Sequence, residues 1–530
     1  MSLARKFIFA AMAMLFVLAA EASAQYDVQS LKVRVKEINV DRREVFDSTF
    51  RDGDWFFAAA LANALHAKTK EFVVSDELLF SPMEETTVSI LEETERNLRA
   101  TGLFSRVRIV LDSADVDSYN VTVLTQDKWS TRPALLFGSS NGSERYGFRI
   151  EELNLAGLGV QLLAEGLYRH ENEIGWQGTA ELNYKRLFRS ELGIYLKLTS
   201  NKYKTEQDLT IEDKYLSLAD ENAFGAKFKN YYGRDFIFYG NGNHLFTSFE
   251  EQKYTAWYSH AWVKRDKIFM TGLAELSFDE RGRGGIPLDS VRAYDNCGRV
   301  LLGFSSSSEE FKKVTKINTY QEEDLATGGY GAATIGKIFS LRGKGWNLYY
   351  ISGQAERSYF GSGLYLFGQV TGASAFATTG GQYTYQEFLG LGFYKFTEDA
   401  LVAVRVREQA TWNWYAKRQL ILDSDFGLRG FAPNSFTGDN RMLANAEFRF
   451  FPDWKVWIAK FSMVAFYDGG TVWNQRSDMM KSHWFTSIGL GLRVHDLKSN
   501  SSNGLFRIDF AYNATDGKFG GIIFTTSQLF

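Results

Sequence analysis

The sequence contains a single cysteine, Cys297, and only 5 prolines in 530 residues. One cysteine cannot form an internal disulfide bond, which excludes a small secreted scaffold held together by disulfides. The formal net charge is -3 and no block of Lys and Arg stands out, so the composition does not indicate a nucleic-acid-binding protein. After Ala24 no apolar run approaches the length of about 20 residues that a membrane-spanning helix needs.

Signatures of enzymatic chemistry are also scarce. The 6 histidines lie far apart, and none has a metal-ligand spacing such as H-x-x-x-H. The glycine-rich stretches are typical of hairpin turns and small strand residues, and none has the pattern of a phosphate-binding loop. We therefore expect a protein that is not an enzyme and that holds neither a metal nor another cofactor.

The N-terminus has the three parts of a secretory signal peptide. Arg5 and Lys6 supply positive charge, residues 7–20 form an apolar run, and residues 22–24 read Ala-Ser-Ala. Small residues at that place suit signal peptidase, so cleavage is predicted before Gln25. Residues 1–24 are thus expected to direct the chain out of the cytoplasm.

What the sequence does have is an unusual mixture of aromatic and polar residues. Aromatic residues make up 15% of the chain, with 44 Phe, 26 Tyr and 12 Trp beside 47 Gly. The mean hydropathy is nevertheless negative, at -0.24. A barrel with a lipid-facing outside and a wet inside has this mixture, because apolar and polar residues alternate and cancel in any window average.

Residues 31–127 mix strand-like and helix-like patterns. A strand is predicted around residues 33–38, one helix from a cap at Asp54 to Leu65, and a second over about 83–100, with Gly102 as its C-terminal cap. Two short strands follow, over residues 106–111 and 119–124. The order β-α-α-β-β predicts one small α+β domain within residues 25–129.

From about Ser130 onward the hydrophobic period is two. In residues 441–450, for example, the apolar side chains of Met442, Phe448 and Phe450 alternate with the charged side chains of Arg441, Glu447 and Arg449. The same pattern recurs in residues 175–185, 402–412 and 506–512, in segments of about ten residues, the length of a tilted membrane-spanning strand. Residues 130–530 are therefore predicted to form a transmembrane antiparallel β-barrel.

The number of strands is harder to predict. The alternation marks about twenty candidates, and some of these are expected to be hairpins within loops. Two polar stretches, residues 202–214 and 309–327, are expected to be extracellular loops.

Several short motifs carry a resemblance to a known family. The run Gly427, Leu428, Arg429, Gly430, Phe431 looks like an (V/I/L)RG(F/Y) loop motif, and residues 466–470, with Phe466, Asp468 and Gly470, match an F-x-D-x-G strand motif. Residues 98–107 look like the second half of a POTRA domain, residues 151–159 resemble an early barrel hairpin, and the chain ends in aromatic-rich sequence. In this order the motifs resemble the BamA/TamA-like outer-membrane assembly superfamily, which also includes two-partner secretion transporters.

The resemblance implies a specific architecture. It implies a 16-stranded barrel, fewer strands than the alternation suggests, preceded by one POTRA domain in the periplasm. It also implies that the loop bearing Arg429 folds back into the lumen, where Arg429 approaches Asp468, with Glu447 as a possible second partner. Phe524 and Phe530 are expected on one face of the last strand, as the signal by which barrels are recognised for assembly.

The function implied is the insertion or translocation of other polypeptides at the outer membrane. The expected partners are the outer-membrane lipid bilayer, an unfolded client polypeptide (a barrel protein or a secreted partner) and periplasmic accessory proteins. A client would pair with the edge of the POTRA sheet, and a seam between residues 133–138 and 520–530 would open sideways. Two alternatives stay open: a dedicated exporter of one secreted partner, although such exporters usually carry two POTRA domains, and a passive or structural channel.

Overall fold

The computed structural model describes residues 32–46, 60–61, 63–64, 66–115, 118–140, 143–215, 220–238, 244–262, 267–281, 296–341, 347–377, 380–413, 420–456, 458–474, 479–497, 505–525 and 528–530. The predicted signal peptide lies outside these residues, as does most of the predicted helix 54–65. None of the helices that the structure describes is long and apolar enough to cross a bilayer.

The N-terminal part is a small sheet covered by helices. Its sheet has the order β2-β1-β4-β3, in which β1 and β4 run parallel and the other pairs antiparallel. Its elements are β1 (Lys32–Arg43), α3 (Glu71–Ser75), β2 (Glu85–Thr87), α4 (Val88–Ala100), β3 (Phe104–Asp115) and β4 (Ser118–Asp127). We call this part the N-terminal domain.

Helix α4 joins this sheet through one apolar face. Leu91 and Leu98 are buried in a core with β1, β3 and β4. The helix begins later than the predicted residue 83 because residues 85–87 form β2, after which the Thr87 hydroxyl accepts a hydrogen bond from the Ile90 N–H. It ends before Gly102, whose φ of 79° is the left-handed conformation that suits glycine at a helix end.

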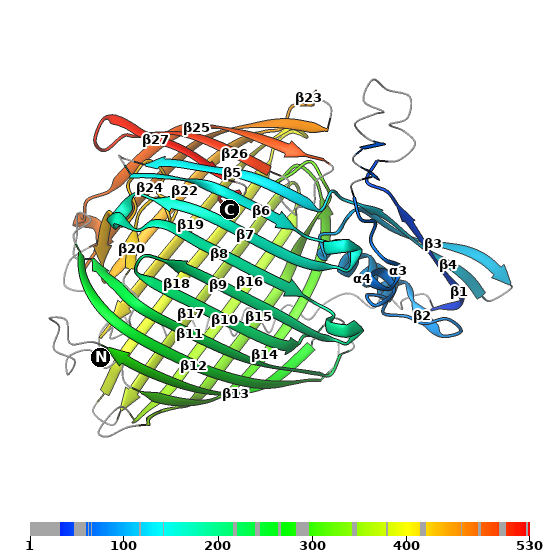
Figure 1. The fold of residues 1–530 in the computed structure, drawn as a ribbon, viewed down its shortest axis with the longest axis horizontal. Helices are drawn as coiled ribbons and strands as arrows, with labels where there is room; N and C mark the ends of the chain where they lie inside the picture. Colours follow the sequence, from blue (N-terminus) through cyan, green and yellow to red (C-terminus); the bar gives the residue numbers. More distant parts are fainter. Residues whose placement is uncertain are drawn as a thin grey trace.

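The rest of the chain forms one closed antiparallel barrel of twenty strands (Figure 1). Its strands are β5 (Thr131–Ser140), β6 (Ser143–Glu152), β7 (Val160–Arg169), β8 (Gly175–Tyr184), β9 (Leu192–Asn201), β10 (Lys204–Asp213), β11 (Asn222–Phe238), β12 (His244–Trp262), β13 (Lys267–Arg281), β14 (Cys297–Val314), β15 (Glu323–Ser340), β16 (Asn347–Gly361), β17 (Leu364–Ala377), β18 (Gly380–Lys395), β19 (Ala400–Trp412), β22 (Asn440–Phe450), β24 (Ala459–Trp473), β25 (Phe485–Asp496), β26 (Leu505–Asn513) and β27 (Lys518–Thr525). The two-residue strand β23 (Lys455–Val456) only extends the turn before β24. The expectation of 16 strands is therefore wrong, and the larger number suggested by the alternation is right.

The two stretches expected to be extracellular loops are part of the wall. Residues 204–213 are strand β10, which pairs along its whole length with β9 and β11. Residues 309–314 and 323–327 are the ends of β14 and β15, at the end of the barrel that carries the N-terminal domain. In β10 the charged side chains of Lys204 and Glu206 line a polar cavity inside the barrel, which a barrel wall tolerates. In β14 Glu310 and Lys312 are exposed and pair with each other at the end of the barrel.

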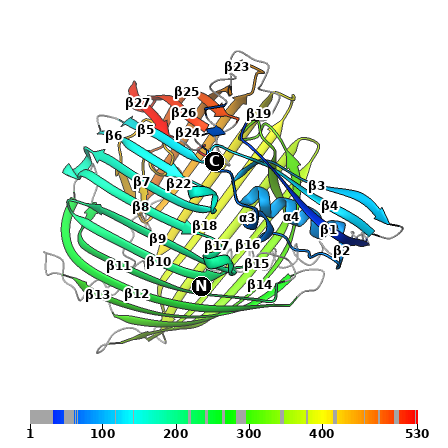
Figure 2. The same ribbon diagram turned by 45° about the vertical axis from the view of Figure 1, so that its right-hand side comes forward.

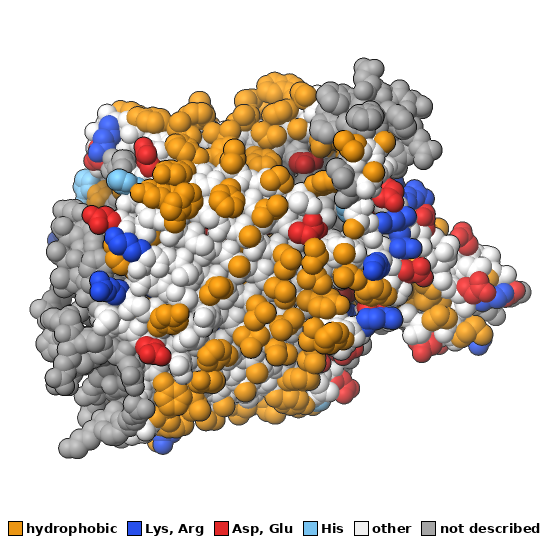
Figure 3. All heavy atoms as spheres, in the orientation of Figure 1, with side chains coloured by type: hydrophobic (Ala, Val, Ile, Leu, Met, Phe, Trp, Pro, Cys, Tyr) orange, Lys and Arg blue, Asp and Glu red, His pale blue; other side chains and the backbone are white. Residues whose placement is uncertain are grey.

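The outer face of the barrel is apolar. Figure 3 shows hydrophobic side chains spread over the wall, whereas many of the charged side chains in this view lie toward its two ends and on the N-terminal domain. Exposed apolar side chains alternate along the strands, as with Val300, Leu302 and Phe304 of β14. At the end away from the N-terminal domain, the rings of Tyr146 and Tyr168 stack 4.8 Å apart, a pair typical of an aromatic girdle at a membrane interface.

The barrel closes where the first strand meets the last. Residues 137–140 of β5 pair with residues 521–524 of β27, whereas β5 pairs with β6 over all of residues 131–140. In the described part of the chain, residues 131–136 of β5 thus have no strand partner on the β27 side. Pro133 lies in this edge, where the lack of an N–H disturbs no ladder. We call this junction the seam.

The N-terminal domain is fixed to one mouth of the barrel (Figure 2). Arg99 of α4 makes a two-point ion pair with Asp324 of β15, with N–O distances of 3.1 and 3.2 Å. On the other side, Arg186 pairs with Glu77. The Lys70 N–H donates to the Gly157 carbonyl, and a Cβ at Gly157 would lie 2.3 Å from the Lys68 oxygen, so the domain and a barrel turn are in direct backbone contact.

The turn between β14 and β15 crosses this mouth. We call residues 315–322 the mouth strap. The Tyr320 hydroxyl contacts the carbonyl oxygens of Pro452, in the turn after β22, and of Phe461, on β24, at 2.6 and 2.8 Å. The Gln321 amide donates to the Leu497 carbonyl. The mouth strap therefore joins distant parts of the wall, beneath the N-terminal domain.

Candidate functional site in the barrel lumen

Five neighbouring strands line one side of the lumen with charged side chains. In β22 the side chains of Arg441, Asn445, Glu447 and Arg449 are buried inside the barrel, whereas Phe448 is exposed on its outside. This is the alternation that the sequence predicts for β22. Strands β19, β24, β25 and β26 present further inward-facing polar residues at the same height, because each is paired in register with its neighbour.

The loop between β19 and β22 returns into the lumen and fills it from within. It carries the short strands β20 (Leu420–Leu422) and β21 (Phe436–Gly438), which pair with each other. Leu422, Leu428 and Phe431 are buried together against Leu443 of the wall. This apolar base fixes the motif part of the loop in one position and so determines where Arg429 points.

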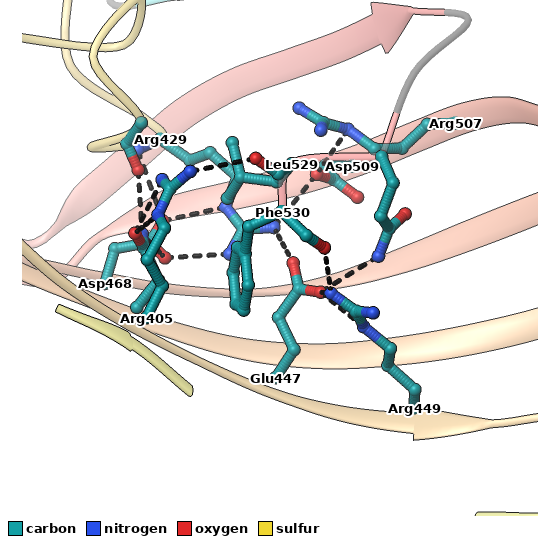
Figure 4. Close-up of polar contacts among 12 residues, drawn as sticks. Arg405, Arg429, Glu447, Arg449, Asp468, Arg507, Asp509, Leu529 and Phe530 are labelled. Atoms are coloured by element: carbon teal, nitrogen blue, oxygen red, sulfur yellow. Dashed lines mark hydrogen bonds and ion pairs between the residues drawn. The ribbon is translucent and has the colours of Figure 1, made fainter. Parts of the chain in front are cut away.

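Arg429 is fully buried and binds three carboxylates. Its Nε and Nη2 donate to the two oxygens of Asp468 at 2.8 and 2.7 Å, and Nη1 donates to Glu447 at 2.9 Å and to Asp509 at 3.1 Å. Its guanidinium carbon also lies 3.5 Å from the centre of the Phe466 ring. Figure 4 shows these contacts within the lumen. The structure thus brings Arg429 to both of the partners that the sequence suggests, and to a third, Asp509.

The charge cluster continues beyond Arg429. Glu447 also accepts from Arg449, and Asp509 accepts from Arg493 at 2.6 Å. Arg405 donates to the Asn445 side chain, which in turn donates to Asp468. Buried ions need paired partners, and here each carboxylate is held by several donors, so the wall and the loop form one electrostatic unit.

Two glycines allow the loop to approach the wall. Gly427 has a φ of 115°, and a Cβ there would lie 2.5 Å from the Arg405 guanidinium. Gly430 has a φ of 83° and packs against Gly520 of β27, where a Cβ would lie 2.6 Å from the Gly430 Cα. The motif loop therefore contacts the strand that forms one side of the seam.

Replacing Gly427 with alanine should loosen the loop. The left-handed backbone costs an alanine on the order of 1–3 kcal/mol, and the new methyl group also displaces Arg405. We expect faster protease cleavage within residues 413–439 and a lower temperature for the shift in gel migration that accompanies barrel unfolding. Gly368→Ala is the matched control, because a Cβ there meets nothing within 4 Å. Equal protease sensitivity of the two variants would contradict this role of Gly427.

The remaining predicted site residues have structural roles, with one correction. Gly470 of β24 leaves room for the side chain of Leu422. Phe524 lies in β27, paired with Phe137 across the seam. Phe530 does not continue that strand, because β27 ends at Thr525 and residues 528–530 lie in the lumen, where the Phe530 oxygen accepts from Arg449. The expectation that Phe524 and Phe530 share one face of the last strand is wrong.

Sequence reasoning missed several members of the cluster. Arg405 and Asp509 stand on the polar faces of alternating segments, but alternation alone does not say which inward-facing charges meet. Their meeting depends on the register between strands far apart in sequence. Over the described residues, no group of three or more His, Cys, Asp or Glu side chains could hold a metal ion.

Comparisons with known proteins agree with the motif reading. Residues 416–530 match the Omp85 superfamily domain, a stretch that contains both the loop motif and the F-x-D-x-G strand, and this confirms the resemblance drawn from the sequence. A search of curated proteins found no significant match.

Three similar solved structures have low sequence identity. They are BamA from Haemophilus ducreyi lacking POTRA domains 1–3 (12% identity, TM-score 0.37, covering 93% of this chain and 83% of that chain), CdiB from Escherichia coli (11%, 0.45, 96% and 94%) and CdiB from Acinetobacter baumannii (11%, 0.42, 98% and 96%). At TM-scores below 0.5 these likenesses carry no further argument.

Proposed function

Because residues 416–530 of this chain are an Omp85 superfamily domain, we propose that the protein is an outer-membrane barrel that inserts or translocates other polypeptide chains. The proposed activity makes and breaks no covalent bonds and needs no cofactor. Its partners are the lipid bilayer, an unfolded client polypeptide and periplasmic accessory proteins. The N-terminal domain, in which the sequence predicts a POTRA domain, would then lie in the periplasm.

One observation carries the proposal. Residues 131–136 of β5 form a strand edge with no partner on the β27 side within the described residues, and Leu135 on this edge is 77% exposed. A backbone edge that faces lipid is costly, because lipid offers no hydrogen-bonding groups. An extended client segment can supply those groups by adding itself as a strand. The seam is therefore the place where a client is expected to enter the wall.

The N-terminal domain would deliver the client to the seam. Its sheet ends in the strands β2 and β3, which can each accept one more strand. Its chain continues from Asp127 at the end of β4 into Thr131 at the start of β5, so the domain is joined directly to the open edge. A client bound at the domain would have a short path to the seam.

Deletion of the gene tests the proposal. Quantitative proteomics of the outer membrane and of the culture medium should show loss of client proteins, restored by the wild-type gene. A broad loss of other barrels would indicate an assembly factor, and loss of one secreted protein a dedicated exporter. If neither fraction changes, client handling is excluded and a passive channel becomes the better account.

A further inference from the structure

The middle of the mouth strap is held inside the barrel. Ile317 is 4% exposed and belongs to an apolar cluster with Phe393 and Phe451 of the wall. The Ile317 carbonyl and the Asn318 side chain both accept from Arg449, at 3.1 and 2.8 Å. Arg449 is also a member of the buried charge cluster. The mouth strap and the charge cluster therefore share one arginine.

The mouth strap has a fixed shape of its own. The carboxylate of Glu323, at the start of β15, accepts from the N–H groups of Asn318 and Thr319 at 3.0 and 3.1 Å. It also accepts from the Asn318 side chain at 2.9 Å. The Lys316 N–H donates to the Thr319 carbonyl, and the Lys316 side chain pairs with Asp399 in the turn before β19. The strap is thus an ordered turn and not a slack connection.

The far end of the mouth strap rests on another part of the wall. The ring of Tyr320 lies edge-on to Phe451 and to His495, with centroids 5.3 and 5.0 Å apart, while its hydroxyl contacts the main chain after β22 and on β24. In the order of the sheet, β16, β17, β18, β19 and β22 lie between β15 and β24. The strap therefore covers the part of the mouth that these strands surround.

The near end of the mouth strap is held by the N-terminal domain (Figure 2). Arg108 of β3 pairs with Glu322 of the strap at 3.1 Å, and Arg99 of α4 pairs with Asp324 just after it. On the β14 side α4 makes two further contacts, Glu95 with Lys313 and Arg96 with the ring of Phe311. The domain thus grips both strands that carry the strap.

We propose that the mouth strap is a gate of the lumen that the N-terminal domain holds closed. A polypeptide that binds the domain and draws α4 and β3 away from Glu322 and Asp324 removes the outer support of the strap. The strap then swings out with Ile317 and uncovers its part of the mouth. The polypeptide that draws the domain away rests on the proposed function, whereas the contacts of the strap are seen in the structure.

Opening the gate leaves no buried charge without a partner. When the strap moves out, Arg449 loses Ile317 and Asn318 but keeps Glu447 and the Phe530 oxygen as acceptors. A buried cation that lost all its acceptors would resist the movement strongly. The wall can therefore exist with the strap in place or removed, as a two-state gate requires.

The accessibility of one thiol tests the proposal. Thr319 is 6% exposed in the closed strap, so Thr319→Cys in a Cys297→Ser background reports its release. The full chain in lipid nanodiscs is treated with a maleimide-linked polyethylene glycol, and the rate of labelling is read on gels. The double change Glu322→Gln, Asp324→Asn removes the grip of the domain and should raise this rate at least tenfold, because labelling of a covered site follows the population of the open form.

Two control variants separate gating from general loosening. Arg189→Met removes an ion pair between the domain and the β8–β9 turn, that of Arg189 with Asp76, and should leave the labelling rate unchanged. On the far side, Tyr320→Phe removes the hydroxyl contacts and should raise the rate, whereas Tyr359→Phe, on the exposed outer face of β16, should not. The temperature of the gel-migration shift should be that of wild type throughout. Equal labelling of the Glu322, Asp324 double variant and of Arg189→Met would overturn the proposal.

The gate and the proposed function fail separately. If labelling rises as expected but gene deletion leaves both proteomes unchanged, the strap is a gate and the proposed function is wrong. If client proteins are lost on deletion but all variants are labelled alike, client handling stands and the gate is wrong. Where Thr319→Cys does not fold, conductance across a planar bilayer decides, because the double variant without the cysteine should conduct more than wild type and equal conductance would overturn the gate.

Discussion

Replacing Arg429 with methionine should free the lumenal loop and destabilise the barrel by about 3–5 kcal/mol, the usual effect of removing one partner from a buried ion pair. Among the described residues, Arg429 is the one cation that is hydrogen-bonded to Asp468, whose other donors are the neutral side chains of Asn445 and Ser487 and the Arg429 N–H itself. The change therefore leaves Asp468 buried and charged with no cation hydrogen-bonded to it. Glu447 and Asp509 keep Arg449 and Arg493.

The size of the effect should depend on which partner is removed. Asp468→Asn should reduce the stability of the barrel less than Arg429→Met, because Arg429 then keeps Glu447 and Asp509 as partners. The double variant Arg429→Met, Asp468→Leu should recover part of the loss, since it removes both buried charges. The stability of the barrel is measured by the temperature at which its gel migration shifts on unfolding. Release of the loop is measured by the rate of protease cleavage within residues 413–439.

A partly exposed ion pair in the same lumen serves as the control. Arg299 of β14 pairs with Glu275 at 2.6 Å, and its side chain is 36% exposed. Such pairs contribute about 0–1 kcal/mol, so Arg299→Met should leave the unfolding temperature nearly unchanged. If Arg429→Met and Arg299→Met behaved alike, the buried cluster would not hold the loop.

The sequence predicts which side chains of a wall strand face inward or outward better than it predicts how many strands close the barrel. The faces of β22 follow from a period of two, because each inward position must be polar or small and each outward position apolar. The number of strands does not follow from the family resemblance. The sequence of strand β10 favours a loop because only Leu209 and Ile211 supply apolar outward residues, while Lys204, Glu206 and Asp208 carry charge.

Which residues meet in the lumenal cluster depends on pairing between strands far apart in the chain, and the sequence does not show that pairing. The contact of Arg429 with Asp468 could be anticipated from two short motifs. The contribution of Asp509 requires β26 to lie two strands from β24, which only the closed sheet establishes. The inward turn of residues 528–530 is likewise invisible to alternation, because Gln528 and Phe530 continue the period of β27 while the chain leaves the wall for Arg405 and Arg449.

A disulfide across the seam should abolish client handling if clients enter there. Gly138 and Ile523 are register partners on β5 and β27, and opposed residues of antiparallel strands have the Cα separation that a disulfide needs. A Cβ at Gly138 meets nothing within 4 Å, so a cysteine fits there without strain. Cys297 is first replaced by serine, so that Gly138→Cys and Ile523→Cys are the only thiols.

Under oxidising conditions the bridged protein should lose at least nine tenths of its client handling, and a reductant should restore it. The loss follows because the bridge covalently fixes a junction in which, among the described residues, residues 137–140 pair with residues 521–524. The pairing to be broken is short, so opening it costs little in the unbridged protein and becomes impossible in the bridged one. The assay is the recovery of lost client proteins when the variant replaces the deleted gene.

A second bridge separates opening of the seam from general stiffening of the barrel. Leu162 and Leu182 are register partners on β7 and β8, and β7 lies two strands away from β5 at the seam. The variant with cysteines at these two positions should handle clients normally whether oxidised or reduced. Client handling that survives the Gly138–Ile523 bridge would show that clients pass through the lumen without parting β5 from β27. The same result would leave the free edge of residues 131–136 as a binding site and not a gate, because a client strand can add to that edge with the rest of the seam closed.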